Sequence, residues 1–509
     1  MTPVPVVLRS VRVSAAAGLV SFFSSSSSVS TEDSLELTRR CASSKPLLIK
    51  EIAKQVGMVI AEGADVINLS QGVPCLSVFP EAVESMTALL ATGKLPYSDV
   101  QGLNDVRDSA STFVNTFYSN DRRTFSFTRD HCLVTAGGIQ GCFVTLALAV
   151  ESAQDVVLST VPAYALYDPP SLLPSSCPVT MCIEGVHVSA RYPSQCNYFG
   201  GTFRTVATTR EAGFAMTADA IQTAFEEQRR EGRRVRVLVV CSPNNPTGSC
   251  LDMAEAERIA AQLELELDRG EDFIVLLDEV YLGIERDKHV SLLHAAGPRL
   301  LARTVLMLSA SKGLGAMPGL RAAWVTSENR DLVREMTKVQ TVASANASTV
   351  AQAGLKGALD NLLSDPSVLE AVNGYYSTRT AFVVDRLNAL GRKYDLGDIC
   401  AQPSGTFYCW CDFSALREKL REKQASLGTS GPLPVDSDLD LCEMLLHLHR
   451  TPHGVGLAVV PGSAFSMNAQ DMLLRISCAK DDMQDLERAV SCVDYALGSL
   501  LPVSTSGCR

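Results

Sequence analysis

Residues 308–321 read Leu-Ser-Ala-Ser-Lys-Gly-Leu-Gly-Ala-Met-Pro-Gly-Leu-Arg. Lys312 is the only amine in this stretch, and small residues surround it at the end of an apolar run. A glycine-rich turn then leads to Arg321, nine residues after the lysine (321 − 312 = 9). An amine placed after a buried strand is typical of a reactive lysine, so this stretch predicts a site built around Lys312.

Two polar motifs precede Lys312 in the chain. Residues 242–248 read Ser-Pro-Asn-Asn-Pro-Thr-Gly, and the prolines predict a rigid turn that points Asn245 as a fixed donor. Asp278 and Tyr281 follow the apolar residues 273–277. A carboxylate buried at the end of an apolar strand needs a cation, so Asp278 predicts a positively charged partner. A helix cap is the alternative for Asp278.

Three weaker signals accompany these motifs. Residues 135–140 read Thr-Ala-Gly-Gly-Ile-Gln and join a predicted strand to a helix, where backbone N–H groups attract a phosphate. A simple chain turn is the alternative for these glycines. Tyr164 suits stacking on a heteroaromatic ring, with a core tyrosine as the alternative. Arg475 is a lone charge in the apolar residues 473–477 and suits capture of an α-carboxylate, with an internal ion pair as the alternative.

The combination matches the chemistry of pyridoxal phosphate, which needs an amine, an acid for its ring nitrogen, donors for its phenolate and an anion cradle. Lys312 would form the Schiff base and then act as the base that moves a proton between substrate and cofactor. Asp278 would keep the ring nitrogen protonated. Ser309, Ser311 and Arg321 would hold the phosphate.

These motifs resemble those of the class I/II aminotransferases of pyridoxal-phosphate (PLP) fold type I, the aspartate aminotransferase superfamily. The resemblance extends from about residue 67 to residue 497. It implies an α/β fold with a large domain, in which helices sandwich a mostly parallel sheet, and a smaller α+β domain. It also implies transfer of an amino group from an L-amino acid to a 2-oxo acid by a ping-pong mechanism.

The resemblance assigns roles by position. Lys312 matches the Schiff-base lysine, Asp278 the partner of the ring nitrogen, and Asn245 and Tyr281 the partners of the phenolate oxygen. The positions for phosphate binding and ring stacking are matched by Gly138, Ile139, Ser309, Arg321 and Tyr164. The positions for the substrate carboxylate are matched by Gly72, Asn245 and Arg475. Tyr97 matches a tyrosine that reaches the phosphate of a neighbouring subunit, which implies a homodimer with shared active sites.

Two departures from the family pattern concern placement and substrate. Many members have the arginine eight residues after the lysine, whereas Arg321 follows Lys312 by nine. No residue matches a partner for the side-chain carboxylate of an acidic amino acid, so neutral or aromatic donors are expected over aspartate.

A lyase, a decarboxylase or a cyclopropane-forming synthase on the same scaffold is the alternative function. A regulator with an N-terminal helix-turn-helix is not expected, because only one helix is predicted before Gly72.

The order of apolar segments also predicts an α/β fold. Seven short apolar runs are predicted as buried strands: residues 131–137, 155–161, 178–183, 235–242, 273–279, 304–311 and 321–327. Helical segments such as residues 140–152 and 253–268 separate most of them, which is typical of a largely parallel sheet with helices on both faces. Ligands bind beyond the carboxyl ends of such strands, where the polar motifs fall.

The remaining segments suggest the domain organisation. Long helices over residues 331–341 and 351–363, a hairpin-like segment over 405–410 and a C-terminal helix predict the smaller domain. The expected domains are a disordered tail or transit peptide over 1–35, the large PLP-binding domain over 71–330, the small domain over 36–70 and 331–502, and a tail over 503–509.

Composition restricts partners and location. The net charge of −11 and the absence of a basic face argue against nucleic acid, and no apolar run reaches the roughly 20 residues of a membrane helix. His447, His449 and His453 lack further ligands nearby, so no metal site is expected.

The first 31 residues contain no acid, two arginines and a serine tract, which predicts a mitochondrial or other organellar transit peptide. A secretory signal or a disordered tail in a cytoplasmic protein is the alternative, and a diffuse cytosolic signal from a fused reporter would contradict targeting.

Overall fold

The computed structural model describes residues 48–162, 191–428 and 433–503. Its largest element is a seven-stranded sheet with the order β2-β8-β7-β6-β5-β3-β4. The strands are β2 (Cys132–Thr135), β3 (Asp155–Val161), β4 (Thr202–Ala207), β5 (Arg234–Cys241), β6 (Ile274–Asp278), β7 (Thr304–Ser309) and β8 (Ala323–Thr326). Strands β3 to β7 are parallel, whereas β8 is antiparallel to both β7 and β2. The predicted α/β fold class is therefore confirmed.

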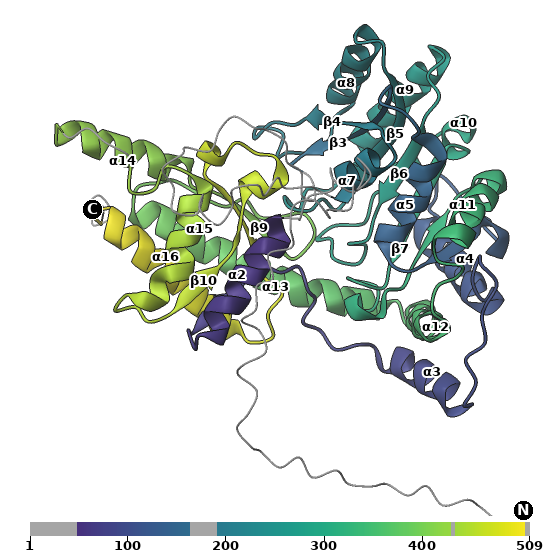
Figure 1. Ribbon diagram of the computed structural model, residues 1–509, viewed down its shortest axis with the longest axis horizontal. Helices are drawn as coiled ribbons and strands as arrows, with labels where there is room; N and C mark the ends of the chain where they lie inside the picture. Colours follow the sequence, from purple (N-terminus) through teal and green to yellow (C-terminus); the bar gives the residue numbers. More distant parts are fainter. Residues whose placement is uncertain (1–47, 163–190, 429–432, 504–509) are drawn as a thin grey trace, which may run out of the picture.

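Alternate residues of the central strands enter two different hydrophobic cores. In β6, Val275 and Leu277 belong to one core, whereas Leu276 belongs to the other. Helices cover both faces, as Figure 1 shows for the right-hand part of the molecule. One face carries α5 (Gly138–Ala149), α7 (Arg191–Tyr198) and α11 (Arg330–Ala343), and the other carries α4 (Asn104–Tyr118), α8 (Ala218–Arg230), α9 (Met253–Asp268) and α12 (Thr349–Ser364). A sheet buried on both faces explains why its strands read as continuous apolar runs.

The smaller part of the molecule lies beside the large sheet, on the left in Figure 1. Its antiparallel sheet has the order β11-β12-β9, formed by β9 (Tyr408–Asp412), β11 (Val460–Pro461) and β12 (Leu473–Ser477). The helices around it are α13 (Ser367–Lys393), α14 (Ser414–Ser426), α15 (Asp438–Leu446) and α16 (Met483–Leu500). The N-terminal helix α2 (Leu48–Ala61) leads into β1 (Val66–Asn68), which pairs with β10 (Gly456–Ala458). The predicted α+β character of this part is confirmed.

Three details differ from the sequence-based expectation or lie beyond it. Residues 405–410 do not form a local hairpin, because β9 pairs with β12 more than sixty residues later. Strand β4 was not predicted, because it is an edge strand with partly exposed, polar positions. The predicted strand over residues 178–183 lies outside the described residues. Helix α11 packs on α5, whereas α12 packs on α3 (Pro80–Ala91) and α4. The boundaries of the domains remain a prediction.

The parallel strands bring the polar motifs to one edge of the sheet. Cys241, Asp278 and Met307 lie in register on β5, β6 and β7. The segments that leave these strands therefore begin side by side, and α5 begins directly after β2. This edge is where a ligand site is expected in an open α/β sheet. Within the described ranges, no helix combines the length and apolarity needed to cross a membrane.

Candidate active site

Lys312 lies in the turn that follows β7. Its Nζ donates a hydrogen bond to the carbonyl oxygen of Gly72 and lies 5.6 Å from the ring centroid of Tyr281. The turn packs tightly on the segment that carries Tyr281, because a Cβ on Gly313 would lie 2.3 Å from the carbonyl oxygen of Leu282. Glycine at this position thus lets the lysine approach the residues that follow β6.

Asp278 is the last residue of β6 and is buried. Its Oδ2 accepts a hydrogen bond from the hydroxyl of Tyr192, which is buried in α7. Burial and the neighbouring Asp278 carboxylate raise the pKa of Tyr192 well above its usual value, so this phenol stays a neutral donor. The structure describes Asp278 at a strand end and not as the cap of a helix.

Asn245 and Tyr281 meet in the buried space beside Lys312. The amide Nδ2 of Asn245 donates to the Tyr281 hydroxyl over 3.2 Å. The Asn245 turn is held against the smaller part of the molecule, since a Cβ on Gly248 would lie 2.6 Å from the carbonyl oxygen of Gly405. The predicted pair of donors is therefore brought together by the ends of β5 and β6.

Arg475 lies on β12 and is only 1% exposed. Its guanidinium donates to the carbonyl oxygen of Ser70 over 2.7 Å and to Oδ1 of Asn245 over 3.1 Å. Its Cζ also lies 4.4 Å from the ring centroid of Tyr408 and 5.1 Å from that of Phe465. Within the described part of the chain, Arg475 has no carboxylate partner, and its Nε has no hydrogen-bond acceptor. The expected alternative, an internal ion pair, is not found there.

The residues predicted to hold a phosphate lie around the start of α5. Gly137 precedes the helix with a φ of 85°, and a Cβ there would lie 2.3 Å from the guanidinium of Arg321. Arg321 thus lies against the helix start, where the first backbone N–H groups point outward. Ser309 is the last residue of β7, Ser311 follows the strand, and their hydroxyl groups are 2.9 Å apart. A Cβ on the first helical residue, Gly138, would lie 3.4 Å from Sδ of Met307 on β7.

The other predicted residues have different surroundings. Gly72 lies next to Tyr408, whose hydroxyl oxygen would be 1.8 Å from a Cβ at that position. Tyr97 is 92% exposed in the single chain, and Ile139 at the start of α5 is 39% exposed. Tyr164 lies outside the described residues. Over the described residues, no group of three or more His, Cys, Asp or Glu side chains is arranged to hold a metal ion.

A buried ionic cluster supports the segment that carries Tyr281. Glu279 accepts hydrogen bonds from the hydroxyl groups of Tyr118 and Ser291, both over 2.6 Å, and lies 2.8 Å from Nε2 of His289. The other ring nitrogen of His289 lies 3.1 Å from Glu285. Burial alone would lower the pKa of His289, but the two carboxylates raise it to about 10. The charged ring therefore ties together the two ends of the Tyr281 segment.

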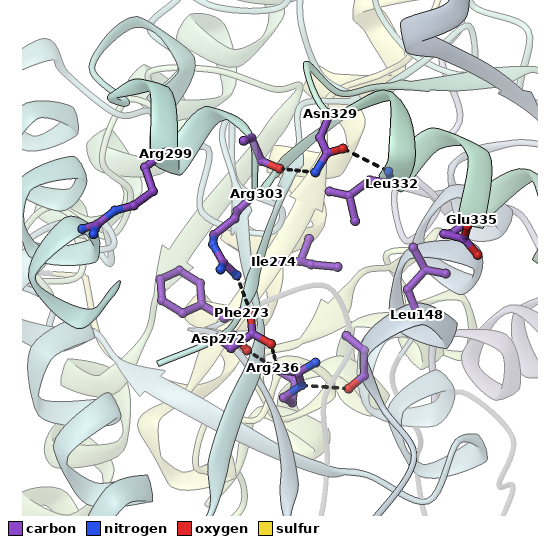
Figure 2. Close-up of a pocket in the computed structure, with 12 residues that line it drawn as sticks. Leu148, Arg236, Asp272, Phe273, Ile274, Arg299, Arg303, Asn329, Leu332 and Glu335 are labelled. Atoms are coloured by element: carbon purple, nitrogen blue, oxygen red, sulfur yellow. Dashed lines mark hydrogen bonds and ion pairs between the residues drawn. The ribbon is translucent and has the colours of Figure 1, made fainter. Parts of the chain in front are cut away.

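A cavity of about 580 Å³ at the opposite edge of the sheet also contains arginines. Figure 2 shows Arg236 and Arg303 both directed at the carboxylate of Asp272, at the amino ends of β5 to β7. The third arginine of this cavity, Arg299, pairs with Glu264 and Asp268. Because each of these arginines has an acidic partner, the cavity differs from the surroundings of Arg475. It also lies away from Lys312.

Comparison with known proteins decides the family. The model of the family described as aminotransferase class I and II matches residues 64–170 and 187–493. The chain belongs to this family. The aminotransferase is 24% identical over 459 residues to the aspartate/prephenate aminotransferase of Nitrosomonas europaea, covering 90% of this chain and 99% of that protein. It is also 24% identical over 421 residues to the aspartate aminotransferase of Thermotoga maritima, covering 82% of this chain and 88% of that one.

Solved structures show the same fold. The aspartate aminotransferase from Rhizobium meliloti matches the aminotransferase with a TM-score of 0.72 and 22% identity, covering 92% of this chain and 100% of that one. The aspartate aminotransferase from Thermus thermophilus with maleate matches with a TM-score of 0.70 and 22% identity, covering 91% and 100%. The resemblance to class I/II aminotransferases predicted from the motifs is thus confirmed.

The aminotransferase has three site residues that the sequence did not reveal. Tyr192 contacts Asp278, Tyr408 contacts Tyr281 and Arg475, and the Ser70 carbonyl accepts from Arg475. Each contact joins distant parts of the chain, separated by 86 residues for Tyr192 and Asp278 and by 127 for Tyr281 and Tyr408. A tyrosine in a strand-like run carries no signal of its own, although Tyr408 lies in the segment 405–410 that was predicted to be hairpin-like.

Proposed function

We propose that the aminotransferase binds pyridoxal phosphate at Lys312 and moves an amino group from an L-amino acid to a 2-oxo acid. The observation that carries the proposal is the buried guanidinium of Arg475, which shares Asn245 with Tyr281 and has no carboxylate partner in the described part of the chain. A buried charge without a counterion implies an anionic ligand. A planar guanidinium suits the carboxylate that all L-amino acids and 2-oxo acids share.

The donor set beside Arg475 fits the cofactor. Asp278, at the end of β6, suits a protonated ring nitrogen, and Asn245 and Tyr281 suit a phenolate oxygen. The start of α5, with Gly137 backed by the Arg321 guanidinium, suits a phosphate because its N–H groups and the arginine both attract an anion. When bound, pyridoxal phosphate would supply an electron sink for the negative charge that develops at the substrate α-carbon.

The side chains divide the remaining work. Arg475 binds the substrate carboxylate and thereby sets which bond of the α-carbon faces the lysine. Lys312, held in the turn after β7, is the base that takes the proton from the substrate α-carbon at its Nζ and would deliver it to the cofactor during transfer. Asp278 holds the ring-nitrogen proton at its carboxylate, with Tyr192 as a neutral donor behind it. Tyr281 holds a proton at the phenolate oxygen, oriented by Asn245.

The half-reaction separates transfer from its alternatives. The protein would first be reconstituted with pyridoxal phosphate, whose link to Lys312 gives a visible absorbance. L-aspartate, L-alanine and L-phenylalanine would then each be added without any 2-oxo acid. We expect at least one of them to bleach the visible absorbance and release one equivalent of its own 2-oxo acid. The relatives are named for aspartate, whereas the sequence favours neutral or aromatic donors, so all three belong in the panel. Release of ammonia or carbon dioxide with the absorbance restored would instead identify a lyase or a decarboxylase.

We further propose that the aminotransferase is a homodimer in which Tyr97 completes the phosphate site of the partner subunit. A tyrosine that is 92% exposed in the single chain is available for such a contact. Mixing the inactive Lys312→Ala protein with a weak Tyr97→Ala protein should restore about a quarter of wild-type activity, because half of the dimers are mixed and each has one intact site of two. No gain on mixing would mean that Tyr97 serves its own chain or that the protein is monomeric.

A further inference from the structure

Tyr408 lies where three parts of the active site meet. It begins β9 and is buried. Its hydroxyl oxygen is 2.9 Å from that of Tyr281, and its ring faces the Arg475 guanidinium at 4.4 Å. Its hydroxyl also fills the space beside Gly72, whose carbonyl accepts from Lys312. One side chain therefore touches the substrate-carboxylate arginine, the phenol and the segment next to the lysine.

Asn245 and Tyr408 are two hydrogen-bond partners of the Tyr281 hydroxyl. A phenol has one hydrogen to donate and two acceptor positions. A guanidinium only donates, so the Asn245 atom that faces Arg475 is the oxygen, and the NH₂ group of the same amide must face Tyr281. Asn245 therefore fills one acceptor position of Tyr281. The direction of the hydrogen bond between Tyr408 and Tyr281 then decides where the Tyr281 proton points.

We infer that Tyr408 donates its hydroxyl hydrogen to Tyr281 and is a positioning residue for the Tyr281 proton. With both acceptor positions filled, the Tyr281 hydroxyl donates in the third direction, away from Asn245 and Tyr408. The inference rests on the proposed function, in which this donation meets the phenolate oxygen of the cofactor. If the hydrogen bond ran in the opposite direction, Tyr281 would donate its only hydroxyl hydrogen to Tyr408 and could not donate to the cofactor.

Tyr408→Phe tests the inference, because it removes the hydroxyl and keeps the ring under Arg475. The readout is the pH midpoint of the visible absorbance of the reconstituted full-length protein. Without the Tyr408 hydroxyl, Tyr281 is no longer oriented to donate to the phenolate oxygen of the cofactor, and this oxygen becomes more basic. The proton that the oxygen shares with the Lys312 nitrogen is therefore held to higher pH. We expect the midpoint to rise by about one pH unit, while the Kd of 3-phenylpropionate, a carboxylate without an amine, changes less than about threefold.

Two further variants separate the hydroxyl from the ring. Tyr408→Leu also removes the face beneath the guanidinium, so 3-phenylpropionate should bind about 5- to 30-fold more weakly. Gly72→Ala pushes the Tyr408 hydroxyl aside without removing it and should reproduce the raised midpoint. The control is Tyr376→Phe, a buried phenol that packs on Phe407 at 5.0 Å between ring centroids and should change neither quantity.

The outcomes are distinguishable. A wild-type protein that takes up no pyridoxal phosphate would contradict the proposed function itself. A wild-type protein with a titrating visible band, together with a folded Tyr408→Phe protein whose midpoint is unchanged, would overturn only the inference about Tyr408. If Tyr408→Phe does not melt cooperatively, Gly72→Ala decides, and an unchanged midpoint there would overturn the inference as well.

Discussion

Lys312→Ala is expected to lose amino-group transfer by at least about 10⁴-fold in kcat and to lose the visible absorbance of the reconstituted protein. The loss is large because the same amine anchors the proposed cofactor and moves the α-proton. Steady-state assays with the preferred donor and 2-oxoglutarate, together with absorbance spectra, measure both effects. Added methylamine should restore part of the activity, since a small amine can enter the space that the side chain leaves.

The control for this variant is Lys338→Ala. Lys338 lies on α11, where it is exposed and pairs with Glu335 one turn earlier. Its removal should leave kcat and the spectrum unchanged, because exposed pairs of this kind contribute little. A Lys312→Ala protein that keeps both the visible band and the activity would show that another amine carries the cofactor.

Arg475→Lys is expected to lower kcat/KM for L-amino acids by about 10²- to 10³-fold, equivalent to about 3–4 kcal/mol. The substitution keeps a positive charge but removes the planar pair of donors that a carboxylate accepts. Amines that lack a carboxylate should react equally slowly with the variant and the wild type. That comparison shows whether the loss belongs to carboxylate binding or to a general disturbance of the site.

The matched control is Arg303→Gln, in the cavity at the other edge of the sheet. Arg303 is partly exposed and is paired with Asp272, so its replacement should change kcat/KM less than about twofold. If Arg475→Lys retains wild-type kcat/KM for every L-amino acid tested, the substrate carboxylate binds elsewhere. Arg475 would then not be the residue that binds the substrate carboxylate, even if Lys312 holds the cofactor.

Much of the fold could be predicted from the sequence because the patterns that specify its strands and helices are local. Strand β3 and helix α9 coincide with the predicted residues, since a strand buried on both faces and an amphipathic helix each leave a clear pattern. Strand β4 was missed because an edge strand lacks the continuous apolar pattern. The hairpin over residues 405–410 was wrong because the partner of β9 is β12, which no short-range pattern identifies.

The residues of the candidate site were likewise predicted only in part. Lys312, Asp278 and Asn245 were predicted because each interrupts an apolar run or occupies a proline turn, and Arg475 because it is a lone charge in a strand. Tyr192 and Tyr408 were not, because a buried tyrosine looks the same in sequence whether or not its hydroxyl meets a functional group. Only the folded chain shows that Tyr408 connects Tyr281 with Arg475.

The most direct test of the account is chemical. Reconstituted protein would be reduced with borohydride, digested, and searched by mass spectrometry for the lysine that carries the pyridoxyl group. The pyridoxyl group is expected on Lys312, and it should be absent from that peptide when an amino-acid substrate is added before reduction. Modification of a different lysine, or of none in a protein that still transfers amino groups, would contradict the central claim.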